Sequence, residues 1–144
     1  MFRKTTVLIL VFITIFFTGF SQKPVVSNSD KPAEVVLTPY KTTLLADGKD
    51  KAIIKVTIVD REGNAIPDAG NLIEFVVTGD AQIIQIEKGD SGKGKITKVA
   101  AENAKKTSFN GASRVTLQAG KSAGHIKFKA TSKGLWDEVQ ILLP

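Results

Sequence analysis

The sequence predicts an all-β fold, an antiparallel β-sandwich of about seven to nine strands. Short runs alternate apolar and polar residues, and turn residues interrupt these runs at roughly 8–12-residue spacing. No long segment shows the 3.6-residue period of an amphipathic helix. The chain of 144 residues allows one domain and is too short for a (β/α)₈ barrel of about 250 residues.

The alternation places the strands in chain order. The clearest strand covers 51–60, where Ala52, Ile54, Val56 and Ile58 share one face. By the same pattern, the other strands are predicted at 34–37, 42–45, 72–78, 81–87, 96–101, 113–118, 124–131 and 136–143. The turns between them hold Gly, Asn and Asp, which tolerate left-handed backbone or bond to nearby backbone groups.

The N-terminus differs in composition from the rest of the chain. Arg3 and Lys4 precede the apolar run 7–17, and small residues, Gly19 and Ser21, follow it. This pattern predicts a signal peptide over 1–21, cleaved after Ser21, and export to the periplasm, the cell surface or the medium. The alternative, an uncleaved anchor, is disfavoured because the apolar run is shorter than the roughly 20 residues that span a bilayer.

The segment 22–33 is polar and holds two prolines, which predicts a flexible linker ahead of a single domain over 34–144. With no cysteine, the domain has no disulfide and no thiolate metal site.

The charge pattern argues against a nucleic-acid partner. The net charge is +6, and the lysines are spread along the chain rather than gathered in one basic stretch. The densest stretch is 88–106, where Lys88, Lys93 and Lys95 are candidate contact residues. A solvated loop with an edge strand is the preferred interpretation of this stretch, and contact with an anionic glycan or surface is the alternative.

The residues suited to catalysis do not assemble into a site. His125 is the only histidine, which excludes Ser-His-Asp, Cys-His and multi-histidine metal sites, and its position opposite Ile126 predicts a surface side chain. The carboxylates fall at turns and strand ends, where bonding to backbone explains them. The segment 60–64 departs from the calcium-loop pattern, and no phosphate-binding motif is present. We therefore assign no catalytic residue, metal or cofactor.

Two aromatic side chains are the remaining candidates for contact. Trp136 and Tyr40 are the only Trp and Tyr of the chain. Trp136 has the parity opposite to Val139, Ile141 and Leu143, so it is expected to point away from the core. Three roles stay open for it: contact with a sugar, part of a docking surface, or local packing.

A family resemblance lies in the predicted strands and the turns between them. Its first half is carried by LADGKD at 45–50, KAIIKVTIVD at 51–60, REGNAIPDA at 61–69 and NLIEF at 71–75. Its second half is carried by SFNGA at 108–112, AGHI at 123–126 and ATSKGL at 130–135. These stretches resemble the C-terminal immunoglobulin-like domain of glycoside hydrolase family 2 enzymes, bacterial β-galactosidases especially. The first half is also similar to the Ig-like repeats of invasin- and intimin-type adhesins.

The resemblance implies an immunoglobulin-like β-sandwich without catalytic residues, because the family's glutamates lie in a separate barrel domain. The expected function is an exported, non-catalytic module that contacts a glycoside hydrolase catalytic chain or a glycan in carbohydrate metabolism. A cell-surface adhesion module is the alternative. A small glycosidase would need two carboxylates roughly 5–10 Å apart in a cleft.

Overall fold

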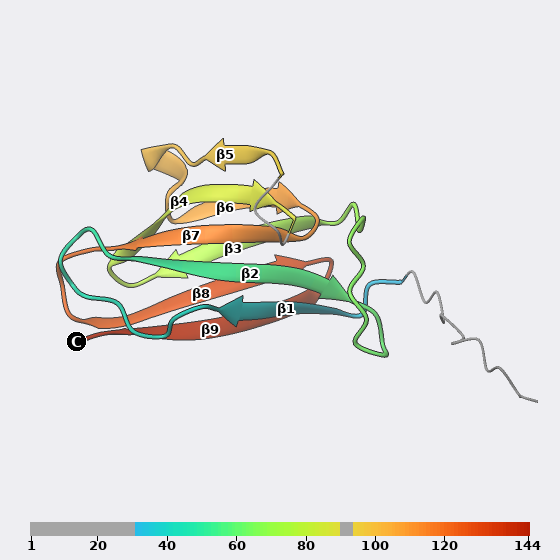
Figure 1. The fold of residues 1–144 in the computed structure, drawn as a ribbon, viewed down its shortest axis with the longest axis horizontal. Coiled ribbons are helices and arrows are strands. Elements are labelled where there is room, and N and C mark those ends of the chain that lie inside the picture. The colour runs from blue at the N-terminus through green and yellow to red at the C-terminus, as the bar shows by residue number, and fades with distance from the viewer. Residues whose placement is uncertain (1–30, 90–93) are drawn as a thin grey trace, which may run out of the picture.

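The computed structural model describes residues 31–89 and 94–144, which form two antiparallel sheets packed face to face (Figure 1). The predicted signal peptide, most of the predicted linker and Lys93 lie outside the described residues. Within the described ranges, no helix is long and apolar enough to cross a membrane.

The nine strands divide between a five-stranded and a four-stranded sheet. The five-stranded sheet has the order β1-β2-β7-β4-β5, with β1 (Glu34–Pro39), β2 (Lys51–Val59), β7 (Ser113–Ala119), β4 (Ala81–Lys88) and β5 (Ile96–Lys98). The four-stranded sheet has the order β6-β3-β8-β9, with β6 (Lys106–Asn110), β3 (Leu72–Thr78), β8 (Gly124–Ser132) and β9 (Leu135–Leu143). The prediction of an immunoglobulin-like β-sandwich is confirmed.

The core lies between the sheets and is built from the inward parity of each strand. Phe75 of β3 and Phe128 of β8 are fully buried, and their rings stack with centroids 5.6 Å apart. Ile54, Ile83 and Leu117 of the opposite sheet are also fully buried. Each such side chain contributes about 1.5–3 kcal/mol on burial, so period-two alternation is the main determinant of this fold.

The predicted strand at 42–45 is wrong. After β1 the chain crosses from the edge of the five-stranded sheet to the edge of the four-stranded one, where Thr43 forms a single parallel bridge with Leu142 of β9. The Leu44 amide donates to the Leu142 carbonyl at 2.9 Å. Within 42–45, Leu44 is the one buried side chain. A single inward side chain in a crossing segment therefore produced a sequence pattern that resembles the alternation of a strand.

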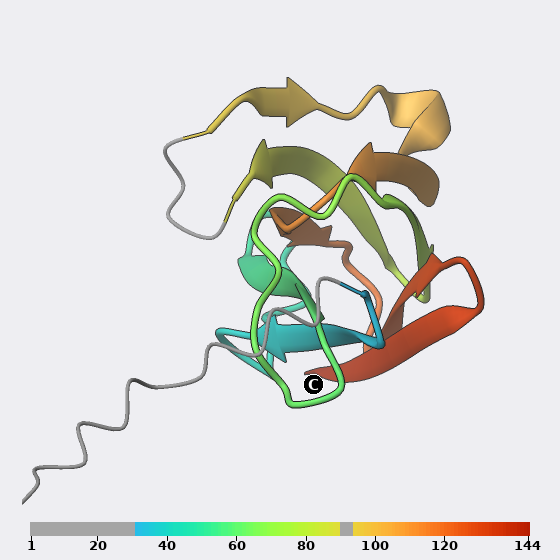
Figure 2. The same ribbon diagram turned by 90° about the vertical axis from the view of Figure 1, so that its right-hand side faces the viewer.

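The opposite side of the sandwich also departs from the prediction. The strand predicted at 96–101 ends at Lys98, and a 3₁₀ helix follows at Ala101–Asn103. The strand β6 was not predicted, because only Thr107 and Phe109 of its five residues turn inward. Figure 2 shows β5 and the 3₁₀ helix on the side of the sandwich away from β9.

Candidate contact sites

Trp136 lies on the outer face of the four-stranded sheet. Its side chain is 61% exposed, which confirms that it points away from the core. It is paired with Thr131 of β8, and the Lys129 ammonium lies over its ring, 4.8 Å from the centroid. An exposed indole next to a hydroxyl and an ammonium is able to stack on a sugar ring and to hydrogen-bond its hydroxyls.

Tyr40 lies on the other side of the sandwich. It follows β1, its amide donates to the Ile53 carbonyl of β2 at 2.9 Å, and its ring is 58% exposed. The Arg114 guanidinium of β7 lies over the ring at 5.6 Å. Since Arg114 has the parity opposite to buried Val115, this contact is on the outer face of the five-stranded sheet. Tyr40 and Trp136 therefore do not form one platform.

The candidate lysines occupy a third place. Lys88 ends β4, and its amide donates to the Lys95 carbonyl at 2.9 Å, so the backbones of these two exposed residues meet at the base of one loop. This loop joins β4 to β5, at the edge of the five-stranded sheet opposite β1. Among the described residues, the candidates Trp136, Tyr40, Lys88 and Lys95 thus belong to three separate surfaces rather than to one site. His125 is exposed, as its position predicted.

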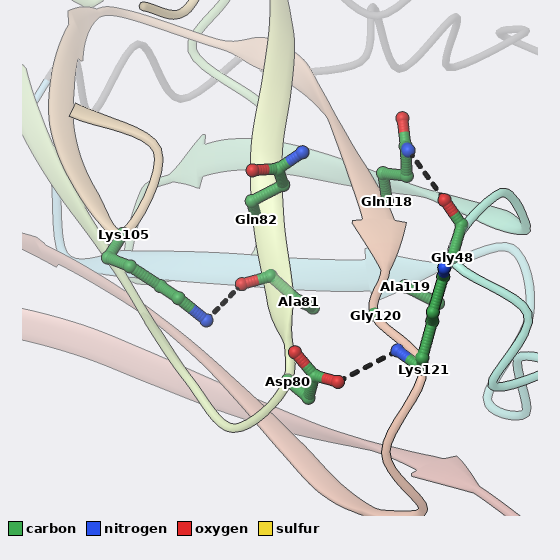
Figure 3. A pocket seen from close by; sticks show the side chains of 9 residues that line it. All are labelled: Gly48, Asp80, Ala81, Gln82, Lys105, Gln118, Ala119, Gly120 and Lys121. Carbon is green, nitrogen blue, oxygen red and sulfur yellow. Dashed lines mark hydrogen bonds between the residues drawn. The ribbon is translucent and has the colours of Figure 1, made fainter. Parts of the chain in front are cut away.

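A polar pocket of about 430 Å³ opens at one end of the sandwich (Figure 3). Four loops and the strands next to them build it, and it is lined by Gly48, Asp80, Ala81, Gln82, Lys105, Gln118, Ala119, Gly120 and Lys121. No pattern in the sequence predicted this pocket. Its polar side chains lie far apart in the chain and share no motif, so only the topology brings them together.

Asp80 joins two loops across this pocket. Its Oδ2 accepts hydrogen bonds from the amides of Lys121 at 2.8 Å and Ser122 at 2.7 Å. These bonds, that of Ser122 first, lower the pKa of the Asp80 carboxyl below its usual range. Gly120 allows this approach, because a Cβ there would lie 2.1 Å from the Asp80 carboxylate.

Two other polar side chains of the pocket, Lys105 and Gln118, bind backbone carbonyls of the fold. The Lys105 ammonium donates to the carbonyls of Gly79 and Ala81, and the Gln118 amide donates to the Gly48 carbonyl at 2.8 Å. Asp80 is the one carboxylate among the described residues that line the pocket. The pocket therefore lacks the two-carboxylate arrangement that glycoside hydrolysis uses.

Two further turn aspartates, Asp47 and Asp60, accept hydrogen bonds from nearby backbone, as the sequence predicted. Asp47 Oδ1 accepts from the amides of Lys49 and Asp50, each at 2.7 Å. Asp60 Oδ1 accepts from the amides of Glu62 and Asn64, each at 2.9 Å. Among the described residues, no group of three or more His, Cys, Asp or Glu side chains is placed to hold a metal ion.

The comparisons with known proteins agree with the architecture. Residues 35–139 match the family model of the glycoside hydrolase family 2 C-terminal domain 5. The chain belongs to this family. It is 36% identical over 110 residues to the β-galactosidase BoGH2A of Bacteroides ovatus. A solved glycosyl hydrolase family 2 member from Bacteroides cellulosilyticus is similar over 79% of the chain, at 26% identity and a TM-score of 0.65.

These relatives are much longer than the region they share with this chain. The match covers 76% of this chain but 12% of the β-galactosidase, and 14% of the B. cellulosilyticus structure. The adhesin InvE of Yersinia pseudotuberculosis shares the fold over 76% of the chain, at 19% identity and a TM-score of 0.50. What the chain shares with the hydrolases is their C-terminal domain.

Proposed function

We propose that this protein is an exported, non-catalytic module that contacts a protein or a glycan in carbohydrate metabolism. The observation that supports this most is the family match, because residues 35–139 correspond to a C-terminal domain of glycoside hydrolases. The match to 12% of a β-galactosidase leaves most of that enzyme without a counterpart in this chain. The proposed mechanism is surface complementarity, through a sheet face or a loop rim.

Export is part of the same proposal. Its support is the basic, apolar and small-residue order of the first 21 residues, which is typical of a secretory signal. N-terminal sequencing of the protein recovered from its host tests this directly. A chain that begins at Gln22 is the expected result, and a chain that still carries residues 1–21 in the cytoplasm would contradict export.

The contact role is tested by native size-exclusion of the exported fraction, with antibody detection of this chain. Co-elution with a larger species that hydrolyses an aryl glycoside is expected for a module that docks on a catalytic chain. Elution as a free chain that is retained on immobilised glycan is expected for a glycan-binding module. Turnover of an aryl galactoside by the purified chain alone would refute the non-catalytic proposal, and a free chain retained on no glycan would refute the contact role.

The alternative function is a cell-surface adhesion module. Its support is the fold shared with InvE, at an identity that carries the fold alone. Protease treatment of intact cells separates the two proposals by location. An adhesin displayed on the outer surface is cut, while a periplasmic accessory module is protected.

A further inference from the structure

We propose that the outer face of the four-stranded sheet, with Trp136 on its edge strand β9, binds a neutral oligosaccharide. This inference rests on the proposed contact function and names its surface and its ligand. We call this surface the Trp136 face. It consists of the outward-pointing side chains of β6, β3, β8 and β9, among them Ser108, Glu74, Thr131 and Trp136.

The Trp136 face holds a large share of the exposed apolar surface. Of the seven large hydrophobic side chains that the described residues leave exposed, four lie on it, namely Leu72, Val76, Trp136 and Leu142. Trp136 is the largest of them and is 61% exposed. The register spreads them, with Trp136 and Leu142 near opposite ends of β9, so the indole is a single apolar platform on this face rather than part of one contiguous patch.

The strand register aligns Trp136 with three polar side chains. Trp136 is paired with Thr131, Thr131 with Glu74, and Glu74 with Ser108, which makes one row across all four strands. Adjacent strands lie about 4.8 Å apart, which is close to the length of one sugar ring in a chain. An oligosaccharide laid along this row stacks one ring on Trp136 and presents the hydroxyls of its next rings to Thr131, Glu74 and Ser108.

The charges along the row favour a neutral sugar. Lys129 and Thr131 supply donors beside Trp136, while Glu138, which is paired with Lys129 and offsets its charge, supplies an acceptor. Sugar hydroxyls both donate and accept, so they satisfy groups of both kinds. The lysines of this face lie off the row, and the one charge within the row is the Glu74 carboxylate, which would repel the carboxylate of a uronic acid laid there.

The polarity around the indole argues against a stable protein partner. The core of a protein interface has few charged residues. Here Lys129 and Glu138 are paired directly beside Trp136. These surroundings suit a short oligosaccharide better.

The ammonium over the indole does not block binding. Lys129 is exposed, so its contact with Trp136 is weak and its long side chain is free to swing aside. After the swing, its ammonium reaches a hydroxyl of the sugar stacked on the ring.

The test is a fluorescence titration of the purified chain, in which Trp136 is the only Trp. The probes are tetrasaccharides of β-linked galactose, glucose and mannose, with a tetragalacturonate as the acidic arm. We expect a saturable change in Trp136 emission with at least one neutral probe, and none with the acidic one. By calorimetry, Trp136→Ala and Glu74→Gln should each weaken binding by about tenfold or more. Tyr40→Ala, which removes an equally exposed aromatic from the other face, should leave the affinity unchanged.

Three results would overturn the inference. The first is neutral binding that survives Trp136→Ala, which would place glycan contact elsewhere and leave the proposed function standing. The second is an emission change caused by a hydrolase catalytic chain but by none of the sugars, which would make this face a protein-docking surface. The third is no emission change with any neutral probe. Circular dichroism of each variant separates lost binding from lost folding.

Discussion

The two outer faces of the sandwich are built by the same alternation and yet present different surfaces. On the five-stranded sheet, the outward apolar side chains Val36, Ile53 and Ile84 are partly covered, while Ile96 of the edge strand β5 is more than half exposed. On the four-stranded sheet, Leu72 and Trp136 are more than half exposed. The two-residue period of a strand determines which side chains point outward. The neighbouring segments determine how exposed those side chains are.

Each face also carries one aromatic ring beneath one cation. Tyr40 with Arg114 and Trp136 with Lys129 are the two pairs. Arg114 is half-buried, whereas Lys129 is exposed. The two rings are almost equally exposed, so the pairs differ in the cation, which is partly covered by the sheet in the first pair and exposed in the second. Because Tyr40 and Trp136 are the only Tyr and Trp of the chain, each face also has its own spectroscopic reporter.

The largest expected effect contrasts the core with the outer face of the same strand. Phe75→Ala removes a fully buried ring stacked on Phe128 and should lower the free energy of unfolding by about 3–5 kcal/mol. Leu72→Ala, at the exposed start of β3, should change it by about 0.5 kcal/mol or less. Urea unfolding measures both. Similar losses would mean that the outer face of β3 is covered.

The second prediction concerns the loops at the end of the sandwich that holds the pocket. Gly120→Ala forces a methyl group against the Asp80 carboxylate and should break its bonds to the amides of Lys121 and Ser122, at a cost of about 1–3 kcal/mol. Gly70→Ala is the matched control, because a Cβ there meets nothing within 4 Å. It should be neutral or stabilising by up to about 1 kcal/mol.

A double-mutant cycle identifies the cause. In an Asp80→Ala background the clash at position 120 is gone, so adding Gly120→Ala should cost much less than it does in the native chain. If the losses in unfolding free energy of the two single variants add fully, Gly120 is needed for its own backbone conformation and not to let the Asp80 carboxylate approach.

The sequence predicted the layers of this fold better than its edges. Strands such as β2 and β8, with three or more inward apolar side chains, were predicted closely, because both sheets bury them. The crossing segment around Leu44 and the short strand β6 were not, since each has only one or two inward side chains. Pairing partners, rather than local alternation, determine the conformation of such segments.

The same distinction applies to the candidate sites. Parity predicted the exposure of Trp136 correctly, because it depends only on neighbours in one strand. The row that joins Trp136 to Glu74 and Ser108 depends on the register of three strand pairs, and the pocket at Asp80 on loops far apart in the chain. No local pattern in the sequence carries that information.

The third prediction compares the two cations directly. Arg114→Ala should destabilise the protein by about 1 kcal/mol, because the half-buried stem of Arg114 packs on the five-stranded sheet as well as holding its charge over Tyr40. Lys129→Ala should cost about 0.5 kcal/mol or less, since Lys129 is exposed. Thermal unfolding at matched pH measures both. Equal losses would remove the distinction between a partly covered cation and an exposed one.

The smallest expected effect is a pH dependence confined to the loop that follows Tyr40. The Asp50 carboxylate accepts from the Lys41 ammonium at 2.6 Å and from the Leu45 amide at 2.9 Å. These bonds, that of Lys41 first, lower the pKa of Asp50 from 3.8 to about 2. The folded carboxyl is thus more acidic than the unfolded one, so its stabilisation is complete above the unfolded pKa and is lost as the pH falls through about 2.

The urea midpoint of the native chain should therefore fall on acidification below about pH 5, and Asp50→Asn should flatten part of that fall. Because Lys41 and Asp50 are an exposed pair, high salt should shrink the difference. Tyr40, which directly precedes Lys41, should report the loosening of this loop, while the emission of Trp136 stays constant as long as the domain remains folded. If the Tyr40 and Trp136 emissions change together, the two faces respond to acid as one unit. The difference between the faces would then be one of surface and not of motion.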